Sequence, residues 1–317
     1  MKCLVTGAAG FIGSTVTRKL LDKGWEVRGI DNFADFYPRV MKEMNLSDIF
    51  DREGFELVEE DLVSCRLDTL MEDVDGVIHL AAQAGVRTSW GTEFRTYTDS
   101  NILATQRLLE AARGGSVQRF VYASSSSVYG ETQRLPLSEE DPLMPLSPYG
   151  VSKLAAERLC RLYWKNFGVP TISLRYFTVY GPGQRPDMSF HRFIRAMLTG
   201  GSFRIFGTGE QTRDFTFVED AAEVTVAALA EGSTGSVYNI GGGNRISLKA
   251  VVDLMAKLTG SEPCFEFQEF EKGDMMHTMA DTTLAGEELG YSPRTGIEAG
   301  LDAEIRWMKK LVEREGR

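Results

Sequence analysis

The stretch KCLVTGAAGFIG, residues 2–13, decides the fold. Its apolar start, Lys2–Thr6, predicts a short buried strand, and the apolar spacing of Phe11–Asp22 predicts a helix that Gly24 ends. Between them stand Gly7, Gly10 and Gly13. Glycines let a backbone turn tightly and approach a pyrophosphate, and the free amides at a helix N-terminus face that anion. The spacing therefore indicates a phosphate-binding turn, although a plain strand-to-helix turn can have the same pattern.

A carboxylate stands at the end of the next predicted strand, Glu26–Ile30, where Asp31 follows Gly13 by 18 residues. At this position a carboxylate binds the ribose hydroxyls of adenosine and repels a 2′-phosphate. The sequence thus favours NAD over NADP as the cofactor. Read alone, Asp31-Asn32 is equally typical of a turn that ends a strand.

Strand-like and helix-like segments alternate through the first half of the chain. Further strands are predicted at residues 55–59, 76–80, 118–123 and 171–175, and helices at 101–113 and 149–167. This alternation predicts an α/β fold built on a Rossmann-type doubly wound parallel sheet. After Tyr176 the predicted elements are helices at 190–198, 248–258 and 296–313, and one more buried strand at 237–240.

The change of pattern after Tyr176 predicts two units. We expect residues 1–176 to form an NAD-binding Rossmann domain, with a returning segment near 214–242. We expect residues 177–213 and 243–317 to form a smaller α/β C-terminal lobe that binds the substrate. The chain would then cross between the two units.

The composition excludes several classes of protein. The chain has 317 residues and a formal net charge of −10 at pH 7, so neither nucleic acid nor an anionic membrane is expected as a partner. Scattered cysteines without a C-x-x-C pair, and histidines far apart, predict no metal site and no disulfide framework. No apolar run is long enough to span a bilayer, and we expect a cytoplasmic protein.

A tyrosine and a lysine open the predicted helix at 149–167. Tyr149 and Lys153 are four residues apart, so they share one face of the helix. An ammonium group near a phenol, together with a positively charged nicotinamide ring, favours the phenolate, which makes the tyrosine a general base at neutral pH. When the motif stands alone, a pair on the solvent face of an amphipathic helix is the other interpretation.

Four serines, Ser124–Ser127, follow the strand predicted at 118–123. In open α/β sheets the ligand chemistry gathers at the carboxyl ends of the strands. A serine there can hydrogen-bond the substrate hydroxyl that is oxidised. A polar loop without a ligand is the alternative, since runs of serine often form loops.

Several motifs occur in one order along the chain: TGAAGFIG (6–13), LAA (80–82), SSSSVYG (124–130), SPYGVSK (147–153), RYFTVY (175–180), GPGQRPDM (181–188) and QTRDFTF (211–217). Together they resemble the extended short-chain dehydrogenase/reductase family, and within it the NAD-dependent nucleotide-sugar epimerases. The resemblance covers essentially the whole chain.

The resemblance implies a role for each matching position. In the family the glycines hold the NAD pyrophosphate, Asp31 the adenosine ribose, and Asp61 and Leu62 the adenine, while an asparagine at position 101 supports the active-site loops. The expected cofactor-binding residues are Gly7, Gly10, Phe11, Ile12, Gly13, Asp31, Asn32, Asp61, Leu62, Leu80, Ala81, Ala82, Gln83, Asn101, Tyr149, Lys153 and Tyr176. The expected catalytic residues are Ser125, Tyr149 and Lys153. The expected substrate-binding residues are Arg87, Ser125, Ser126, Ser127, Thr178, Arg185, Met188, Arg213 and Asp274.

The resemblance also implies a reaction. Tyr149 would remove the proton from the sugar O4 while NAD⁺ takes the hydride from C4, and a 4-keto sugar would turn over in the pocket before both return. Family 4,6-dehydratases carry an Asp-Glu pair where this chain has Ser126-Ser127, and decarboxylases usually carry Glu at the second of these positions. Simple 4-epimerisation is therefore expected.

The stretch GVRTSW (85–90) and the serine run are most similar to those of bacterial UDP-glucuronate 4-epimerases. The 4-keto form of glucuronate is a β-keto acid that readily loses CO₂, so its carboxylate must be held in an unreactive orientation. Closely spaced hydroxyls from Ser125–Ser127 and Thr178, with the charge of Arg185, would hold it. The open alternatives are a UDP-glucose/UDP-galactose or UDP-N-acetylhexosamine 4-epimerase, a net ketosugar oxidoreductase or decarboxylase, and an NAD-binding protein without catalysis.

Two further expectations follow from the resemblance. Residues 271–275 read EKGDM where relatives often have RPGDV, so the usual late arginine is missing or replaced by Lys272. In relatives, the helices matching 101–113 and 149–167 pair across a two-fold axis, which predicts a homodimer. His79, in a predicted buried strand, is expected to be a packed core residue.

Overall fold

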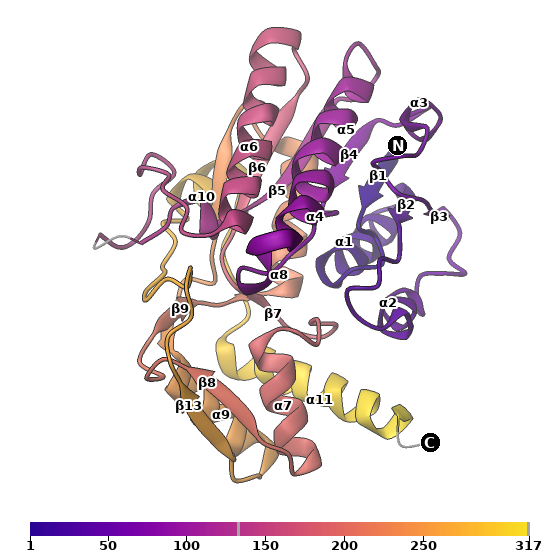
Figure 1. Ribbon diagram of the computed structural model, residues 1–317. Coiled ribbons are helices and arrows are strands. Elements are labelled where there is room, and N and C mark those ends of the chain that lie inside the picture. Colours follow the sequence, from indigo (N-terminus) through magenta and orange to yellow (C-terminus); the bar gives the residue numbers. More distant parts are fainter. Residues whose placement is uncertain (132–133, 316–317) are drawn as a thin grey trace.

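The computed structural model describes residues 1–131 and 134–315. Across these residues the main sheet has seven parallel strands in the order β11-β6-β5-β4-β1-β2-β3 (Figure 1). Its strands are β1 (Lys2–Thr6), β2 (Glu26–Asp31), β3 (Phe55–Glu59), β4 (Gly76–His79), β5 (Arg119–Ser125), β6 (Thr171–Tyr176) and β11 (Val237–Ile240). Because β1 lies between β2 and β4, the strand order reverses there and opens a crevice at the carboxyl ends.

Helices cover both faces of this sheet. On one face, α1 (Phe11–Asp22), α2 (Arg39–Leu46) and α8 (Val218–Glu231) enclose a core into which Cys3 and Val5 point. On the other, α3 (Leu67–Leu70), α5 (Ala104–Ala112) and α6 (Pro148–Phe167) enclose a second core around Leu4 and Val77. Successive side chains of one strand therefore point into two different cores. For this reason the strands are apolar along nearly their whole length. The predicted α/β doubly wound sheet is confirmed.

The smaller C-terminal lobe lies beyond the carboxyl edge of the sheet (Figure 1). It contains α7 (Ser189–Thr199), α9 (Leu248–Thr259), α11 (Ile297–Glu315) and a parallel pair of strands, β8 (Phe203–Phe206) and β13 (Phe265–Gln268). Short strand pairs join the parts: β7 (Val179–Tyr180) with β10 (Thr216–Phe217), and β9 (Thr212–Asp214) with β12 (Arg245–Ser247). Helix α10 (Thr283–Leu289) packs on α8.

Helix α6 matches its predicted range except that it also includes Pro148, because its ends are marked locally. Ser147 caps the N-terminus, where its side chain accepts a hydrogen bond from the Gly150 amide at 3.1 Å, and Pro148 occupies the first turn. Gly168 ends the helix with φ 72°, a left-handed conformation that favours glycine. These signals fix where Tyr149 and Lys153 stand on the helix.

The predicted helix at 101–113 is wrong in its first turn. Residues Thr98–Leu103 form a π-helical segment after α4 (Phe94–Tyr97), and regular helix begins only at Ala104. In this wider turn the Asn101 side chain bonds to the backbone of Gln83 and to Ser152, and π-turns are frequent where a helix serves a site.

Two further properties concern the described part of the chain. No helix there is both long and apolar enough to cross a membrane. Residues 1–131 and 134–315 also contain no group of three or more His, Cys, Asp and Glu side chains that could hold a metal ion.

Candidate active site

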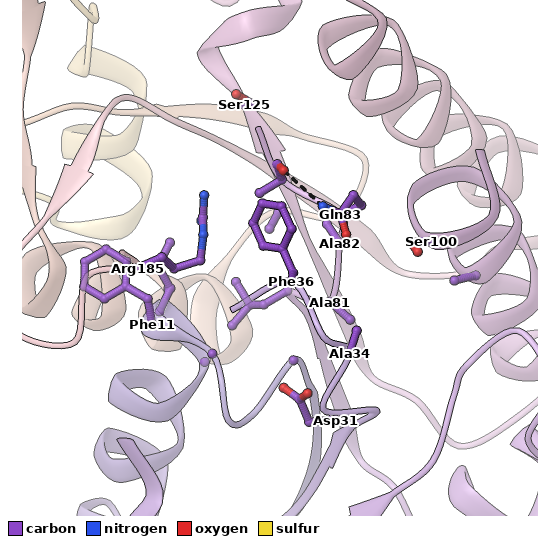
Figure 2. Close-up of a pocket in the computed structure, with 18 of the residues that line it drawn as sticks. Phe11, Asp31, Ala34, Phe36, Ala81, Ala82, Gln83, Ser100, Ser125 and Arg185 are labelled. Atoms are coloured by element: carbon purple, nitrogen blue, oxygen red, sulfur yellow. Dashed lines mark hydrogen bonds between the residues drawn. The ribbon is translucent and has the colours of Figure 1, made fainter. Parts of the chain in front are cut away.

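A pocket of about 360 Å³ opens along the carboxyl ends of β1, β2, β4, β5 and β6. Figure 2 shows Asp31 near one end, Ala82 and Gln83 in the middle, and Ser125 at the other end. Sixteen of the expected cofactor-binding residues line it: Gly7, Gly10, Phe11, Ile12, Gly13, Asp31, Asn32, Asp61, Leu62, Leu80, Ala81, Ala82, Gln83, Tyr149, Lys153 and Tyr176. The pocket is thus an elongated cleft, a shape that suits a dinucleotide.

The glycine turn has no room for side chains. Gly7 has φ +69°, and a Cβ on it would lie 2.9 Å from the backbone nitrogen of Ala81. A Cβ on Gly13 would lie only 2.0 Å from the Gly7 carbonyl oxygen. The turn therefore brings bare backbone and the N-terminus of α1 to the pocket, which fits a pyrophosphate.

Asp31 is held by a partner that the sequence did not reveal. Its Oδ1 accepts from Lys42 Nζ at 2.8 Å and from the Phe33 amide at 2.9 Å, and its Oδ2 accepts from the Ala9 amide at 3.2 Å. Lys42 and Asp31 are both buried, and both line the pocket. The carboxylate is therefore fixed at the place where an adenosine ribose would lie.

The loop after β3 builds the part of the pocket that lies next to Asn32. Asn32 Nδ2 donates to Asp61 Oδ2 at 2.9 Å, which ties the ends of β2 and β3 together. The guanidinium of Arg107, on α5, donates to the carbonyls of Leu62 and Cys65. The loop that carries Asp61 and Leu62 is thus held from both sides.

Asn101 does not line the pocket but lies behind it. Its Oδ1 accepts from the Gln83 amide at 2.7 Å, and its Nδ2 donates to the Gln83 carbonyl at 3.0 Å and to Ser152 Oγ at 2.9 Å. It therefore fixes the backbone of a residue that does line the pocket. His79 is a core residue, as predicted, with its ring nitrogens bonded to Thr6 and Thr105.

Tyr149 is half-buried and lines the pocket, with its ring edge-on to that of Tyr97 at 6.2 Å between ring centroids. Burial raises the pKa of Tyr149, while a hydrogen bond from Ser125 and the charge of Arg185 lower it. The sequence assigned that charge to Lys153. The Lys153 ammonium instead donates to the Ala123 carbonyl at 2.6 Å, and burial lowers its pKa to about 8.

Hydroxyl groups surround the pocket next to Tyr149. Ser125 Oγ accepts from the Ser127 amide at 3.1 Å, which shapes the 3₁₀ turn Ser126–Val128. The three serines, Ser125–Ser127, line the pocket together with Thr178, Arg185 and Met188. Arg185 forms a forked ion pair with Asp187 at 2.9 Å, and its side chain reaches into the pocket (Figure 2).

Two more of the expected substrate residues lie in an adjoining cavity. Arg213 and Asp274 line it, and it shares Ser126, Ser127 and Thr178 with the first pocket. Arg213 donates to the carbonyls of Thr212 and Met276, and burial lowers its pKa. The two cavities thus form one path that leads from the serines into the C-terminal lobe.

Arg87 lies at the outer end of this path, beside Lys272, Trp90 and Phe206. Its guanidinium bonds to Asp274 at 2.8 Å and stacks 4.0 Å from the centre of the Phe206 ring. An arginine from the loop after β4 therefore stands next to the segment where the late arginine of relatives is missing.

The fold and this cleft define an NAD-dependent enzyme of the short-chain dehydrogenase/reductase type. The model of the NAD dependent epimerase/dehydratase family matches residues 3–241. The chain therefore belongs to this family. Several of its relatives are named as UDP-sugar 4-epimerases.

Three relatives are especially similar. An uncharacterized UDP-glucose epimerase of Bacillus subtilis is 46% identical over 99% of this chain and 100% of its own length. A UDP-glucuronate 4-epimerase of Thermodesulfobacterium geofontis is 39% identical over 98% of this chain and 97% of its own length. The crystal structure of UDP-glucuronic acid 4-epimerase from Bacillus cereus, in complex with UDP-glucuronic acid and NAD, is 44% identical with a TM-score of 0.96. That match covers 98% of this chain and 100% of the solved one.

Proposed function

We propose that this protein is an NAD-dependent UDP-glucuronate 4-epimerase, which interconverts UDP-glucuronate and UDP-galacturonate through a transient 4-keto sugar. One observation carries the proposal: the three hydroxyls of Ser125–Ser127, with Thr178 and Arg185, surround the pocket beside Tyr149. The names of two similar relatives, from Thermodesulfobacterium geofontis and Bacillus cereus, support the same substrate.

Tyr149 carries out the proton transfer at the sugar O4. NAD, when bound, would supply a reversible hydride acceptor for C4 of the sugar. Tyr149 takes the O4 proton and holds it on its phenol until the return step, and Ser125 hydrogen-bonds both the phenol and the O4. Lys153, anchored on Ala123, would hold the nicotinamide ribose.

The serine segment, Ser125–Ser127, would hold the carboxylate of the sugar. A β-keto acid loses CO₂ when the breaking bond aligns with the carbonyl π system, so an enzyme that keeps CO₂ must hold the carboxylate out of that alignment. Ser126, Ser127 and Thr178 supply hydroxyl donors and Arg185 a charge for this purpose. These positions carry no acid that could expel a 6-hydroxyl or assist decarboxylation.

The UDP group would extend along the adjoining cavity. Arg213 lines this cavity together with Ser126 and Ser127 and would meet the diphosphate, with Asp274 and its partner Arg87 nearby. In the cofactor cleft, the glycine turn would hold the pyrophosphate, Asp31 the adenosine ribose, and Asp61 and Leu62 the adenine. The remaining expected residues would line the cofactor as the resemblance implies.

Two units and a homodimer are part of the proposal. Residues 1–176 with 214–242 would bind NAD, and residues 177–213 with 243–317 would bind the nucleotide sugar. Apolar side chains are exposed on the outer side of the α6 layer, among them Leu162 (54%), Val151 (47%) and Leu103 (40%). Pairing with a second copy would cover them, and we place the enzyme in the cytoplasm.

The test is incubation of the purified protein with UDP-glucuronate, followed by chromatographic separation of the products. We expect UDP-galacturonate to form without added NAD and without a lasting rise in absorbance at about 340 nm, since a 4-epimerase returns its hydride. Tyr149→Phe is the matched variant, expected to keep bound NAD and lose turnover. Unchanged turnover of that variant would show that Tyr149 is not the base.

A UDP-glucose/UDP-galactose 4-epimerase is the second candidate, favoured by the name of the Bacillus subtilis relative. It would use the same tyrosine and the same hydride return. The two candidates separate in a panel of UDP-sugars, because turnover of UDP-glucose with none of UDP-glucuronate would reverse their order.

A further inference from the structure

A buried ion pair lies directly behind the serine segment, Ser125–Ser127. The guanidinium of Arg175 donates two hydrogen bonds to the carboxylate of Glu157, from Nη2 to Oε1 at 2.7 Å and from Nε to Oε2 at 3.0 Å. Each side chain is only 3% exposed, and neither lines the pocket. Because removing two charges from water often costs as much as their attraction returns, such a pair is weak evidence for stability alone.

Glu157 holds the N-terminal end of the serine segment. Ser124 Oγ donates to Glu157 Oε2 at 2.6 Å. Glu157 lies one helical turn beyond Lys153 on α6, and Lys153 donates to the Ala123 carbonyl at 2.6 Å. Two consecutive residues of β5 are therefore held by the same face of the helix that carries Tyr149.

Arg175 holds the C-terminal end of the segment. Its Nη1 donates to the hydroxyl of Tyr129 at 2.7 Å and to the Glu139 carbonyl at 3.1 Å. Tyr129 directly follows the 3₁₀ turn Ser126–Val128, and its hydroxyl donates to Asn239 on β11 at 2.6 Å. One ion pair therefore fixes residues on both sides of the serine segment.

From this geometry we infer that Glu157 and Arg175 are positioning residues, which hold Ser125–Ser127 in place relative to Tyr149. They act through Ser124 and Tyr129. Arg175 lies opposite Ser124 in the register of β5 and β6, so the pair also joins the two strands that end at the pocket. The inference about position depends only on these contacts.

Its chemical consequence rests on the proposed function. While the 4-keto sugar exists, a loose serine segment lets the carboxylate turn into alignment with the ketone. The bond from C5 to the carboxylate carbon then breaks, CO₂ leaves, and its electron pair forms the C4–C5 enolate, which takes a proton from water. The hydride is not returned, so the cofactor stays reduced. The ion pair thus favours epimerisation over loss of CO₂.

The test uses the NAD-loaded enzyme and two variants of the pair. Glu157→Gln removes the charge and keeps the shape, and Glu157→Met with Arg175→Met replaces the pair by apolar side chains, which buried sites tolerate well. Tyr238→Phe is the control, since it removes a part-buried hydrogen bond to Glu288 without touching the serine segment. The readouts are amide hydrogen exchange at residues 124–129 and the ratio of decarboxylated product to UDP-galacturonate.

We expect exchange at residues 124–129 to be about tenfold faster in the pair variants than in wild type and control. We expect the ratio of decarboxylated to epimerised product to rise about tenfold, with KM almost unchanged. If Glu157→Gln does not fold, both readouts are taken from the double variant, Glu157→Met with Arg175→Met. Unchanged exchange overturns the inference, as does an unchanged product ratio in an enzyme that turns over UDP-glucuronate. Faster exchange in a protein whose wild type is inert toward UDP-glucuronate supports the positioning role and refutes the proposed function.

Discussion

The ammonium of Lys153 lies 2.6 Å from the carbonyl oxygen of Ala123, at the end of β5. It also lies 5.1 Å from the centre of the Tyr122 ring, so both of these contacts of the buried cation are with neutral groups. This contact ties the amine, which is carried by α6, to the residue of β5 that precedes Ser124. It also makes Lys153 a residue whose charge costs stability while serving the site.

That cost predicts the behaviour of Lys153→Met. Burial lowers the pKa of Lys153 from 10.5 to about 8, so between these values the unfolded chain binds more protons than the folded one and stability rises with pH. Below pH 8 the buried charge costs up to about 3 kcal/mol. We expect the variant to gain about 1–3 kcal/mol in free energy of unfolding at pH 7 and to lose turnover. Urea unfolding of nucleotide-free protein at pH 7 and pH 10 measures this, and a variant less stable than wild type at pH 7 would contradict it.

Ser125→Ala tests the electrostatics of Tyr149. The Ser125 hydroxyl lowers the pKa of Tyr149 against the effect of burial, so its loss raises that pKa further. The base form of the tyrosine then becomes scarcer at neutral pH. We expect kcat to fall by about 10²-fold and the acidic limb of its pH profile to move to higher pH. Ser127→Ala, which lines the same pocket, should leave the position of that limb unchanged. If the acidic limb of the kcat profile lies at the same pH in the two variants, Ser125 does not act on Tyr149.

The glycine turn gives a graded prediction. A Cβ at position 13 would lie 2.0 Å from the Gly7 carbonyl oxygen, whereas one at position 10 would lie 3.1 Å from the same atom. We expect Gly13→Ala to lose about 2–3 kcal/mol of stability together with bound NAD, and Gly10→Ala to lose much less stability. Thermal unfolding and the NAD content of the purified proteins measure both effects. Equal losses would mean that the turn adjusts more freely than its contacts indicate.

The proposed homodimer predicts the effect of a charge on the outer face of α6. Leu162 is 54% exposed there, and a glutamate in its place would have to be buried unpaired in the interface. We expect Leu162→Glu to weaken dimerisation about 100-fold or more, so that light scattering gives the monomer mass. Phe50→Glu is the control, since Phe50 is 59% exposed elsewhere and its change should leave the mass unaltered. A wild-type protein whose light scattering gives the monomer mass would contradict the proposed homodimer.

The sequence predicted those parts of the fold whose signals are local. The bounds of β1, α1 and β3 match their predicted ranges, and α6 differs only by including Pro148, because strand patterning, glycines and caps mark the ends of these elements. Helix α8 was missed. It lies against β5, β6 and α1, and it buries most of its residues, so its sequence carries little of the alternation between polar and apolar faces that reveals a helix.

In the candidate site, the lining residues could be found by motif but their partners could not. The pairing of Asp31 with Lys42 depends on where α2 returns to the sheet, and no motif marks that lysine. Arg87 and Asp274 bond although they are 187 residues apart in the chain. Only the arrangement of the two lobes brings them together. The ion pair of Glu157 and Arg175 was invisible for the same reason.

The decisive measurement follows a deuterium label at C4 of UDP-glucuronate during its conversion by the wild-type enzyme. Because Tyr149 lines the cleft in which NAD would stay bound throughout the reaction, the hydride should return to the sugar it left. We expect UDP-galacturonate that retains the deuterium at C4, seen by mass spectrometry and NMR, without exchange into water or added NAD. UDP-galacturonate that has lost the label, or no UDP-galacturonate at all, would contradict the proposed 4-epimerase.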